Sequence, residues 1–390
     1  MIMLSQQQRI FFEFLRFCIG TVQEVPSSLK GADWRVLYAM ARKQCLVGVL
    51  FDGIKRLPAD VGMDKGLLFQ WMAQNQTLRK ANARLDKAAV EVAEWFGRKG
   101  FRTCVLKGQG NALLYPPGME RTPGDIDLWV DGGDRKVVSF VRSLSPDEKV
   151  CYHHIGFPEY NGVEVEVHFR PSFLFCFRHN RRLQGYYERV MDEQFAHKVK
   201  LGEQGEIAVP KAEFNLIFQL THIFTHLMNE GIGLRQLLDY FFLLKNTNFI
   251  GNTDGDGFLF NTDFTDNTDR IGGNADGVDR RLLQDELRRL GLWEFAGAVM
   301  YIMKEVFGLE DNRLIVPPDV KRGRLVLKEV LEAGNFGQYD KRNWFGHSAL
   351  GHNLQRLYRD MRLVRYFPEE ALSEPFFRIW HFFWRKRIVR

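Results

Sequence analysis

The sequence predicts an α+β protein, in which a small mixed β-sheet is flanked by a helical N-terminal segment and a larger helical C-terminal region. Apolar residues recur at helical spacing over most of the first 100 residues and again from residue 211 onward. Between these regions, short runs alternate apolar and polar residues, and Asn161-Gly162 is typical of a tight hairpin turn. The hydrophobic content of 45% and charged content of 26% are those of a globular protein, and 390 residues suffice for two or three domains.

The N-terminal segment is expected to be helical over residues 6–19, 34–56 and 67–98. Gly100 ends the third helix and leads into a buried strand over residues 103–106. We therefore place a helical segment at residues 1–84 and the α/β core at residues 85–205.

The core begins with that strand and a turn at Leu106-Lys107-Gly108, followed by a short helix over residues 109–115 that Pro116-Pro117 ends. A second strand covers residues 124–130, and Gly132-Gly133 separates it from a return helix over residues 134–144. The hairpin turn then joins strands at residues 152–155 and 163–169.

Acidic side chains share one face of these strands. Alternate residues of a strand point the same way, so Asp125 and Asp127 project together, and so do Glu164, Glu166 and His168. Three carboxylates in one place repel each other unless divalent cations lie between them. Mg²⁺ prefers such oxygen ligands and keeps positions open for substrate phosphates, so the pattern predicts metal-assisted phosphoryl or nucleotidyl transfer.

This arrangement resembles the DNA polymerase beta-type nucleotidyltransferase superfamily, and in particular a group of uncharacterised bacterial nucleotidyltransferases. Leu106-Lys107-Gly108 matches the glycine turn of the superfamily, Asp125 and Asp127 match its Asp-x-Asp pair, and Glu166 matches its third carboxylate. The chain departs from the pattern at Gln109, where Gly or Ser is usual, and in the long spacing between the turn and the pair.

The resemblance implies Mg²⁺-dependent transfer of a nucleoside monophosphate from a nucleoside triphosphate (NTP) to a hydroxyl group. Asp125 and Asp127 would bridge two Mg²⁺ ions, and Glu166 would hold the ion that activates the hydroxyl. Glu164, on the same face, is the rival for the third acid.

The turn and nearby side chains are the candidate nucleotide contacts: Lys107, Gly108, Gln109, Arg121 and His168. The N-terminus of the short helix offers free N–H groups to a triphosphate. Lys107 suits a β- or γ-phosphate and Arg121 can bind two oxygens, although either could be an ordinary surface charge. His168 is expected to orient a carboxylate, and zinc ligation with His153 and His154 is the weaker alternative.

We expect a small, sugar-like acceptor, because the sequence contains no recognisable nucleic-acid module. A protein-modifying nucleotidyltransferase is an alternative within enzymes. A catalytically silent nucleotide sensor on the same fold is an alternative of another class. The presence of Asp125, Asp127 and Glu166 argues against an inactive protein, since a site that no longer catalyses a reaction is free to lose a carboxylate.

The C-terminal region, residues 206–390, is expected to be helical apart from an Asn/Asp/Gly-rich insertion at residues 246–279. Asp254-Gly-Asp-Gly257 suggests calcium, but the bidentate Glu of an EF-hand is not in its place. Arg235 and Asp239 are spaced for an ion pair on one helix face, or for a wall of the substrate cleft. His222 and His226 lack the Glu of a zinc protease motif.

The five scattered cysteines, the absence of a signal-peptide pattern and the absence of a long apolar run predict a cytoplasmic protein. The net charge of +6 is concentrated in part at residues 378–390. We expect a final helix on which Trp380, Phe383 and Trp384 pack on the body while the arginines stay in water. Contact with acidic lipid headgroups or nucleic acid is the alternative.

Overall fold

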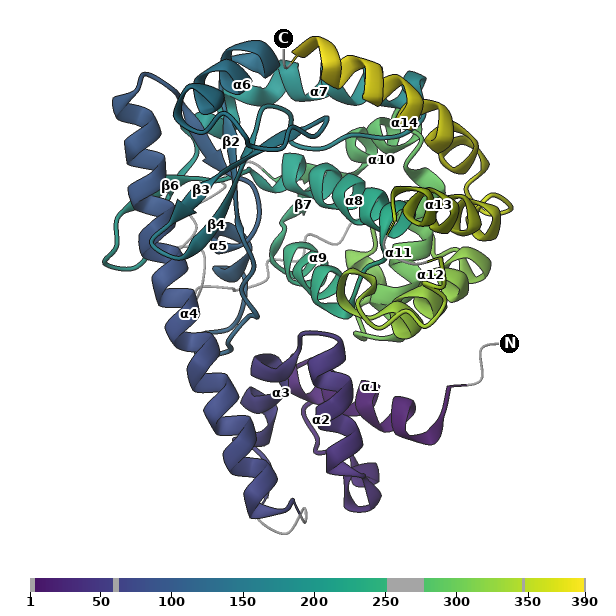
Figure 1. The fold of residues 1–390 in the computed structure, drawn as a ribbon. Helices are drawn as coiled ribbons and strands as arrows, with labels where there is room; N and C mark the ends of the chain where they lie inside the picture. Colours follow the sequence, from purple (N-terminus) through teal and green to yellow (C-terminus); the bar gives the residue numbers. More distant parts are fainter. Residues whose placement is uncertain (1–3, 59–62, 251–276, 346–347, 389–390) are drawn as a thin grey trace.

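A four-stranded sheet lies along one side of the molecule, and helices form most of the rest (Figure 1). This computed structural model describes residues 4–58, 63–250, 277–345 and 348–388. The strands are β1 (Thr103–Val105), β2 (Ile126–Val130), β3 (His154–Tyr160), β4 (Val163–His168), β5 (Lys198–Lys200), β6 (Glu206–Ala208), β7 (Phe249–Ile250) and β8 (Val278–Asp279).

The helices surround the sheet and continue to the C-terminal end. They are α1 (Gln6–Cys18), α2 (Trp34–Lys43), α3 (Val47–Ile54), α4 (Lys65–Arg98), α5 (Gln109–Ala112), α6 (Gly133–Leu144), α7 (Phe177–Ala196), α8 (Ala212–Asn229), α9 (Leu234–Asn246), α10 (Arg280–Arg289), α11 (Trp293–Glu305), α12 (Val320–Ala333), α13 (Ala349–Leu363) and α14 (Pro368–Ile388). Short 3-10 helices lie at Ser27–Gly31, Asp311–Arg313 and Asn335–Gly337. The predicted α+β class is confirmed.

The main sheet has the strand order β1-β2-β4-β3, in which β2 and β4 are parallel and the outer pairs are antiparallel. The parallel register places Asp127 opposite Glu166. The β3–β4 hairpin turns through Asn161 and Gly162, whose φ angles of 52° and 72° are both positive, as a type I′ turn requires. The hairpin prediction is therefore confirmed, while the β2–β4 pairing places two candidate metal ligands on neighbouring strands.

Helix α4 connects the N-terminal helices with the sheet (Figure 1). Asp64 caps its first turn, and Gly100, at φ +83°, carries the chain from its end into β1. The C-terminal half of α4 packs Ala89, Val92 and Phe96 into the core around the sheet. The helix runs unbroken through residues 84 and 85, and the boundaries of the three predicted domains stay predictions.

The single helix predicted over residues 34–56 is wrong. The chain breaks between α2 and α3, where Cys45 has φ 55°. Gln44, the residue after α2, hydrogen-bonds with two backbone groups far away in the sequence. Its side chain accepts from Leu234 N at 2.8 Å and donates to Val330 O at 3.1 Å. The N-terminal helices consequently share a core with the C-terminal region.

Two other elements, α5 and β3, have bounds that differ from the predicted ones. Helix α5 ends at Ala112 and not at residue 115, and the Tyr115 hydroxyl beyond it donates to Asp239 on α9 at 2.7 Å. Strand β3 covers His154–Tyr160 and not residues 152–155, because Tyr152 packs among aromatic rings of α14 while pairing with β4 continues to Tyr160. Strands β7 and β8 pair at the two ends of the insertion. Residues 251–276 lie outside the described residues, so the loop and calcium interpretations stay predictions.

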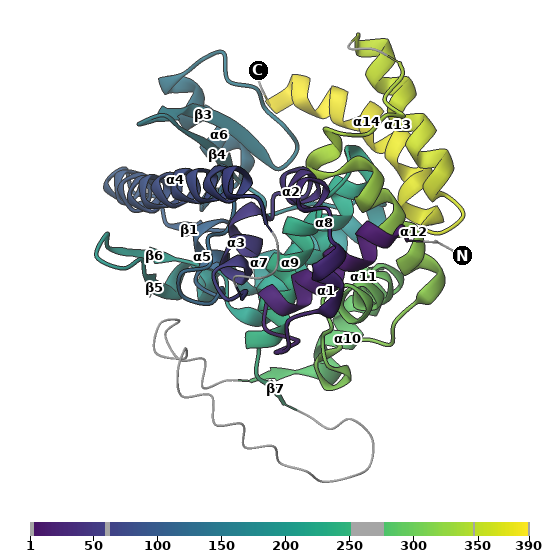
Figure 2. The same ribbon diagram turned by 90° about the horizontal axis from the view of Figure 1, so that it is seen from below.

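Helices α13 and α14 lie at the periphery of the molecule (Figure 2). On α14, Trp384 packs against Tyr152, with ring centroids 5.4 Å apart, as predicted. Trp380 also contacts Tyr152 but is partly exposed, and Phe383 is 58% exposed, so the packing predicted for Phe383 is wrong. Within the described ranges, no helix combines the length and apolar content that a membrane span requires.

Candidate functional site

A cavity of about 630 Å³ lies between the polar ends of β2 and β4 and the helices of the C-terminal region. The strands and the turn contribute Lys107, Gly108, Asp125, Asp127, Glu164, Glu166 and His168 to its wall. Helices α8 and α9 contribute His222, Arg235 and Asp239, and α13 and α14 contribute Arg356, Glu374, Phe377 and Arg378. The cavity therefore combines the predicted carboxylates with side chains far away in the sequence.

Asp127 lies at the centre of the polar contacts in this cavity. It is buried, and its Oδ1 is 2.8 Å from Lys107 Nζ and 3.0 Å from His168 Nε2. The same His168 nitrogen is 3.4 Å from Glu166 Oε2, and Glu166 is partly exposed to the cavity. His168 thus lies between the two carboxylates, in the orienting position expected from the sequence.

The electrostatics follow from these contacts. Burial raises the pKa of Asp127, but Lys107 and His168 outweigh it and hold that pKa well below its usual range. Burial opposes the protonation of His168, yet its hydrogen bonds to Asp127 and Glu166 raise its pKa to about 9. The charge of Asp127 and burial raise the pKa of Asp125. The acids therefore create a strongly negative field that Lys107 and His168 neutralise in part.

The donor set fits a divalent cation. Ligand atoms of Asp127, Glu166 and His168 all lie within 4.8 Å of one another. His168 Nε2 is hydrogen-bonded to Asp127 Oδ1 at 3.0 Å, so it orients the acids, and the carboxylate oxygens are the ligands that Mg²⁺ prefers. Asp125 lines the same cavity but lies outside this closest group. The structure thus brings two predicted acids together and adds an imidazole.

Two further histidines join the site: His222, which is not expected there from the sequence, and His154, which the sequence suggests only as an alternative zinc ligand. His222 Nε2 is 3.1 Å from Lys107 Nζ, and burial keeps the pKa of His222 well below its usual range. A neutral His222 can therefore accept a hydrogen bond from the lysine. His154 Nδ1 lies 3.4 Å from Glu166 and 3.1 Å from His153 Nε2. The sequence groups His154 with His153 and His168 as the alternative zinc cluster, whereas no local sequence pattern links His222 to Lys107.

The turn at Leu106-Lys107-Gly108 has the glycine conformation expected from the sequence. Gly108 has φ +51°, a conformation that favours glycine, and it lines the cavity with Lys107 and Asn111. Gln109 is buried, and its Oε1 has no hydrogen-bond partner in the described part of the chain. Helix α5 is a single turn of four residues, so we assign no anion site to its N-terminus.

Arg121 binds Asp239 and not a solvent-exposed group. Its Nε and Nη2 lie 2.8 and 2.7 Å from the two oxygens of Asp239, and its Nη1 donates to Thr122 O at 3.3 Å. The pair expected between Arg235 and Asp239 is therefore replaced by Arg121–Asp239, because the turn after α5 brings Arg121 against α9. The predicted phosphate contact of Arg121 stays a prediction.

Arg235 is as buried as Arg121 but has fewer hydrogen-bond partners among the described residues. It donates through Nη1 to Thr122 O at 3.2 Å, and its buried Nε has no partner among the described residues. Its guanidinium lies 5.6 Å from the ring centroid of Phe336, which also lines the cavity. Burial and the nearby Arg121 lower the pKa of Arg235. An additional anion would satisfy this arginine, so it joins the candidate phosphate contacts.

The far wall of the cavity is charged as well. Glu374 lies 3.2 Å from Arg378 and 3.8 Å from Arg356. Behind them, burial and the charge of Glu374 raise the pKa of Asp360 to about 8. This wall offers both hydrogen-bond donors and acceptors to a molecule in the cavity.

A family model described as an uncharacterised nucleotidyltransferase matches residues 30–260. The match covers more than half of the chain and includes Lys107, Asp125, Asp127 and Glu166, but it ends before α13 and α14. No curated protein and no solved structure matches the chain.

Proposed function

The chain belongs to this family of uncharacterised nucleotidyltransferases, and from that premise we propose that it transfers a nucleoside monophosphate from an NTP to a hydroxyl group of a small acceptor, with Mg²⁺. The register of β2 and β4 carries the proposal, because it places Asp127 opposite Glu166 in the wall of one cavity. The narrower resemblance to the polymerase beta-type superfamily stays a prediction.

Asp127 and Glu166 would hold the metal, with Asp125 completing the acidic set and His168 fixing both carboxylates. Bound Mg²⁺ neutralises charge on the attacking and leaving oxygens of such a displacement. The ammonium group of Lys107 can turn from Asp127 to a phosphate oxygen. His222 would stay hydrogen-bonded to that ammonium group. Arg235 would contact a second phosphate oxygen.

The transfer itself breaks one bond and forms one. The acceptor oxygen bonds to the α-phosphorus, the bond from that phosphorus to the pyrophosphate oxygen breaks, and pyrophosphate leaves. The hydroxyl proton would pass to Glu166. Burial raises the pKa of Glu166, but its hydrogen bond from His168 and the charge of His154 lower it overall, so the carboxylate is free to accept the proton.

The cavity also supports a small acceptor. Its volume of about 630 Å³ lies within the range of small-molecule sites. The Glu374, Arg356 and Arg378 side chains of the far wall can bind several hydroxyl groups, which favours a sugar-like compound.

Substitution of Glu166 tests the proposal, with Glu164 as a matched control two residues away on the same strand face. Glu166→Gln should bind NTP and Mg²⁺ nearly as well as the wild type, since Asp127 remains. It should release pyrophosphate about a hundredfold more slowly or worse with a pool of hydroxyl acceptors, because the lost stabilisation belongs to the transition state. Glu164→Gln should retain turnover, and the reverse outcome would move the third acid to Glu164.

Asp127→Asn tests the metal site separately. It should remove the Mg²⁺-dependent part of NTP binding, measured as the thermal shift caused by each NTP with and without Mg²⁺. Equal Mg²⁺-dependent affinity in the variant would refute the assignment. One observation favours the sensor alternative, since Lys107 and His168 can neutralise Asp127 without metal. Tight, metal-independent NTP binding without pyrophosphate release would support it. The protein-modifying alternative stays a prediction.

A further inference from the structure

Helices α13 and α14 each carry a row of exposed apolar side chains. The row on α13 consists of Leu350, Leu354, Leu357 and Met361, which are 40–70% exposed. The row on α14 consists of Leu372, Phe376, Ile379 and Phe383, which are 58–68% exposed. Both rows follow the i, i+4, i+7, i+11 spacing of one helix face. We call these eight residues the outer apolar face.

Each row lies opposite the buried side of its helix. On α14, Glu374 and Phe377 are buried, and they line the catalytic cavity. On α13, Arg359 and Leu363 are buried. Isolated exposed apolar residues need no explanation, but two regular rows on neighbouring peripheral helices indicate a surface that binds a partner.

The charge around this face selects the partner. Between residues 349 and 388 the acidic residues are Asp360, Glu369, Glu370 and Glu374, and only Glu369 is exposed. The exposed cations there are Arg365, Lys386 and Arg387. Glu369 is itself paired with Arg178 at 2.8 Å. The outer apolar face is thus bordered by positive charge with little opposing negative charge.

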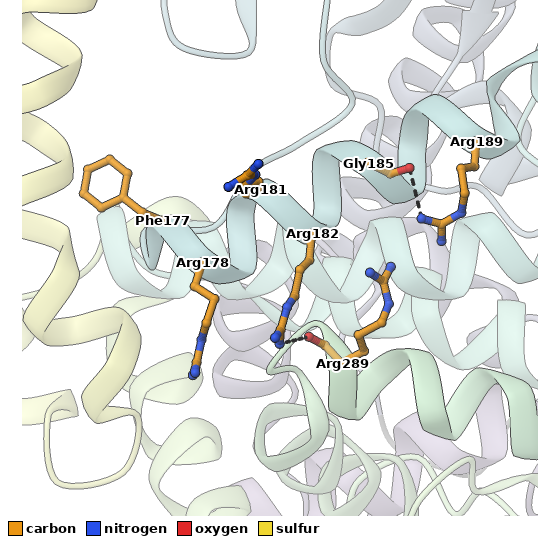
Figure 3. Close-up of a pocket in the computed structure, with 7 residues that line it drawn as sticks. All are labelled: Phe177, Arg178, Arg181, Arg182, Gly185, Arg189 and Arg289. Atoms are coloured by element: carbon orange, nitrogen blue, oxygen red, sulfur yellow. Dashed lines mark hydrogen bonds between the residues drawn. The ribbon is translucent and has the colours of Figure 1, made fainter.

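An arginine-lined groove adds to this positive charge. Figure 3 shows five arginines from α7 and the end of α10: Arg178, Arg181, Arg182, Arg189 and Arg289. Glu286 pairs with two of them, and the groove has a volume of about 620 Å³. It adjoins α14, because Phe177 at its edge contacts Trp380, with ring centroids 5.6 Å apart.

We propose that the outer apolar face docks on an anionic lipid bilayer. An amphipathic helix lies in the bilayer interface by burying its apolar side while Lys and Arg meet the headgroups, without spanning the membrane. A second copy of the chain fits less well, since a symmetric contact would place the positive borders against each other. Nucleic acid also fits less well, because it offers no apolar surface to the Leu, Ile and Met side chains.

Docking would bring the bilayer next to the catalytic cavity, since α14 contributes to both. The proposal does not depend on the transfer reaction, and its test uses no activity measurement. The full chain would be sedimented with phosphatidylcholine vesicles and with vesicles that also contain phosphatidylglycerol. We expect binding to the anionic vesicles, weak binding to the neutral ones, and loss of binding as salt is raised.

Phe376→Ser with Phe383→Ser should weaken partitioning to anionic vesicles by about tenfold or more, because two large side chains no longer enter the bilayer. Phe69→Ser is the matched control. Phe69 is 67% exposed on α4, outside the outer apolar face, and its loss should leave partitioning unchanged. Unchanged melting temperatures would show that all variants fold, as their exposure predicts.

Four results would overturn the proposal. The first is no binding to anionic vesicles, and the second is binding that the Phe376 and Phe383 variant leaves unchanged. The third is a dimer in light scattering that dissociates in this variant while vesicles fail to bind, which would assign the face to a second copy. RNA binding that the variant weakens, without vesicle binding, would likewise assign the face to nucleic acid.

Discussion

Asp239→Asn should destabilise the protein by about 3–5 kcal/mol, because it leaves the guanidinium of Arg121 buried without its counter-charge. Arg121 is only 7% exposed and donates to both oxygens of Asp239, at 2.8 and 2.7 Å. An asparagine keeps one acceptor oxygen and turns an NH₂ group toward a second N–H of the arginine. One charge-assisted bond is lost, and the positive charge remains.

Two controls separate the charge from the other contacts. Tyr115→Phe removes only the phenol bond to Asp239, 2.7 Å long, and should cost about 1 kcal/mol. Asp239→Leu combined with Arg121→Met removes both charges and should cost less than Asp239→Asn alone, since no unpaired charge stays buried. The urea midpoint, followed by tryptophan fluorescence, measures all three variants.

A loss of stability in Asp239→Asn no greater than that in Tyr115→Phe would refute the pairing of buried charges as its cause. That result would mean that Arg121 reaches water or another acceptor, and it would leave Arg121 available for a phosphate. A large cost that the double variant relieves would instead assign Arg121 to structure and leave Arg235 as the candidate phosphate contact.

Two smaller predictions concern the backbone and pH. Gly48→Ala should lower the stability by about 1–3 kcal/mol, because the new Cβ would lie 2.1 Å from the backbone oxygen of Glu120. Gly97→Ala, whose Cβ would have nothing within 4 Å, should raise the stability by up to about 1 kcal/mol. Similar melting temperatures of the two variants would contradict this prediction. Asp360→Asn should match the wild type in melting temperature near pH 4 and exceed it by a margin that grows as the pH rises to 8. Folding raises the pKa of Asp360 to about 8, so the wild type loses stability as pH rises from the ordinary value of that carboxyl through 8, and a pH-independent difference would rule this out.

The elements that could be predicted depend on local chemistry. Asn161-Gly162 fixes its hairpin by backbone conformation alone, and the alternation along Val163–His168 fixes which side chains face the core. Placing Asp127 near Glu166 required only that the two strands be neighbours, which the family resemblance supplied and the register bears out.

The contacts that could not be predicted join residues far apart in the sequence. Arg121 and Asp239 are separated by 118 positions, and Lys107 and His222 by 115. From its neighbours in the sequence alone, each of these residues can be interpreted as a surface charge or as one member of a pair on one helix face. Gln44 likewise has no local reason to end its helix, because its partners Leu234 and Val330 appear only when the helices have packed.

The wall of the cavity likewise combines residues that are close in the sequence with residues that are far apart. Its acidic end is built from β2, β4 and the glycine turn, all within the part of the chain that the family model matches. Its far wall comes in part from Arg356, Glu374 and Arg378, which lie beyond that match. A wall contributed by α13 and α14 can change its side chains without disturbing the ligands on the strands. We therefore expect the strands to determine the reaction, and α13 and α14, whose outer faces meet the proposed bilayer, to determine which acceptor reaches it.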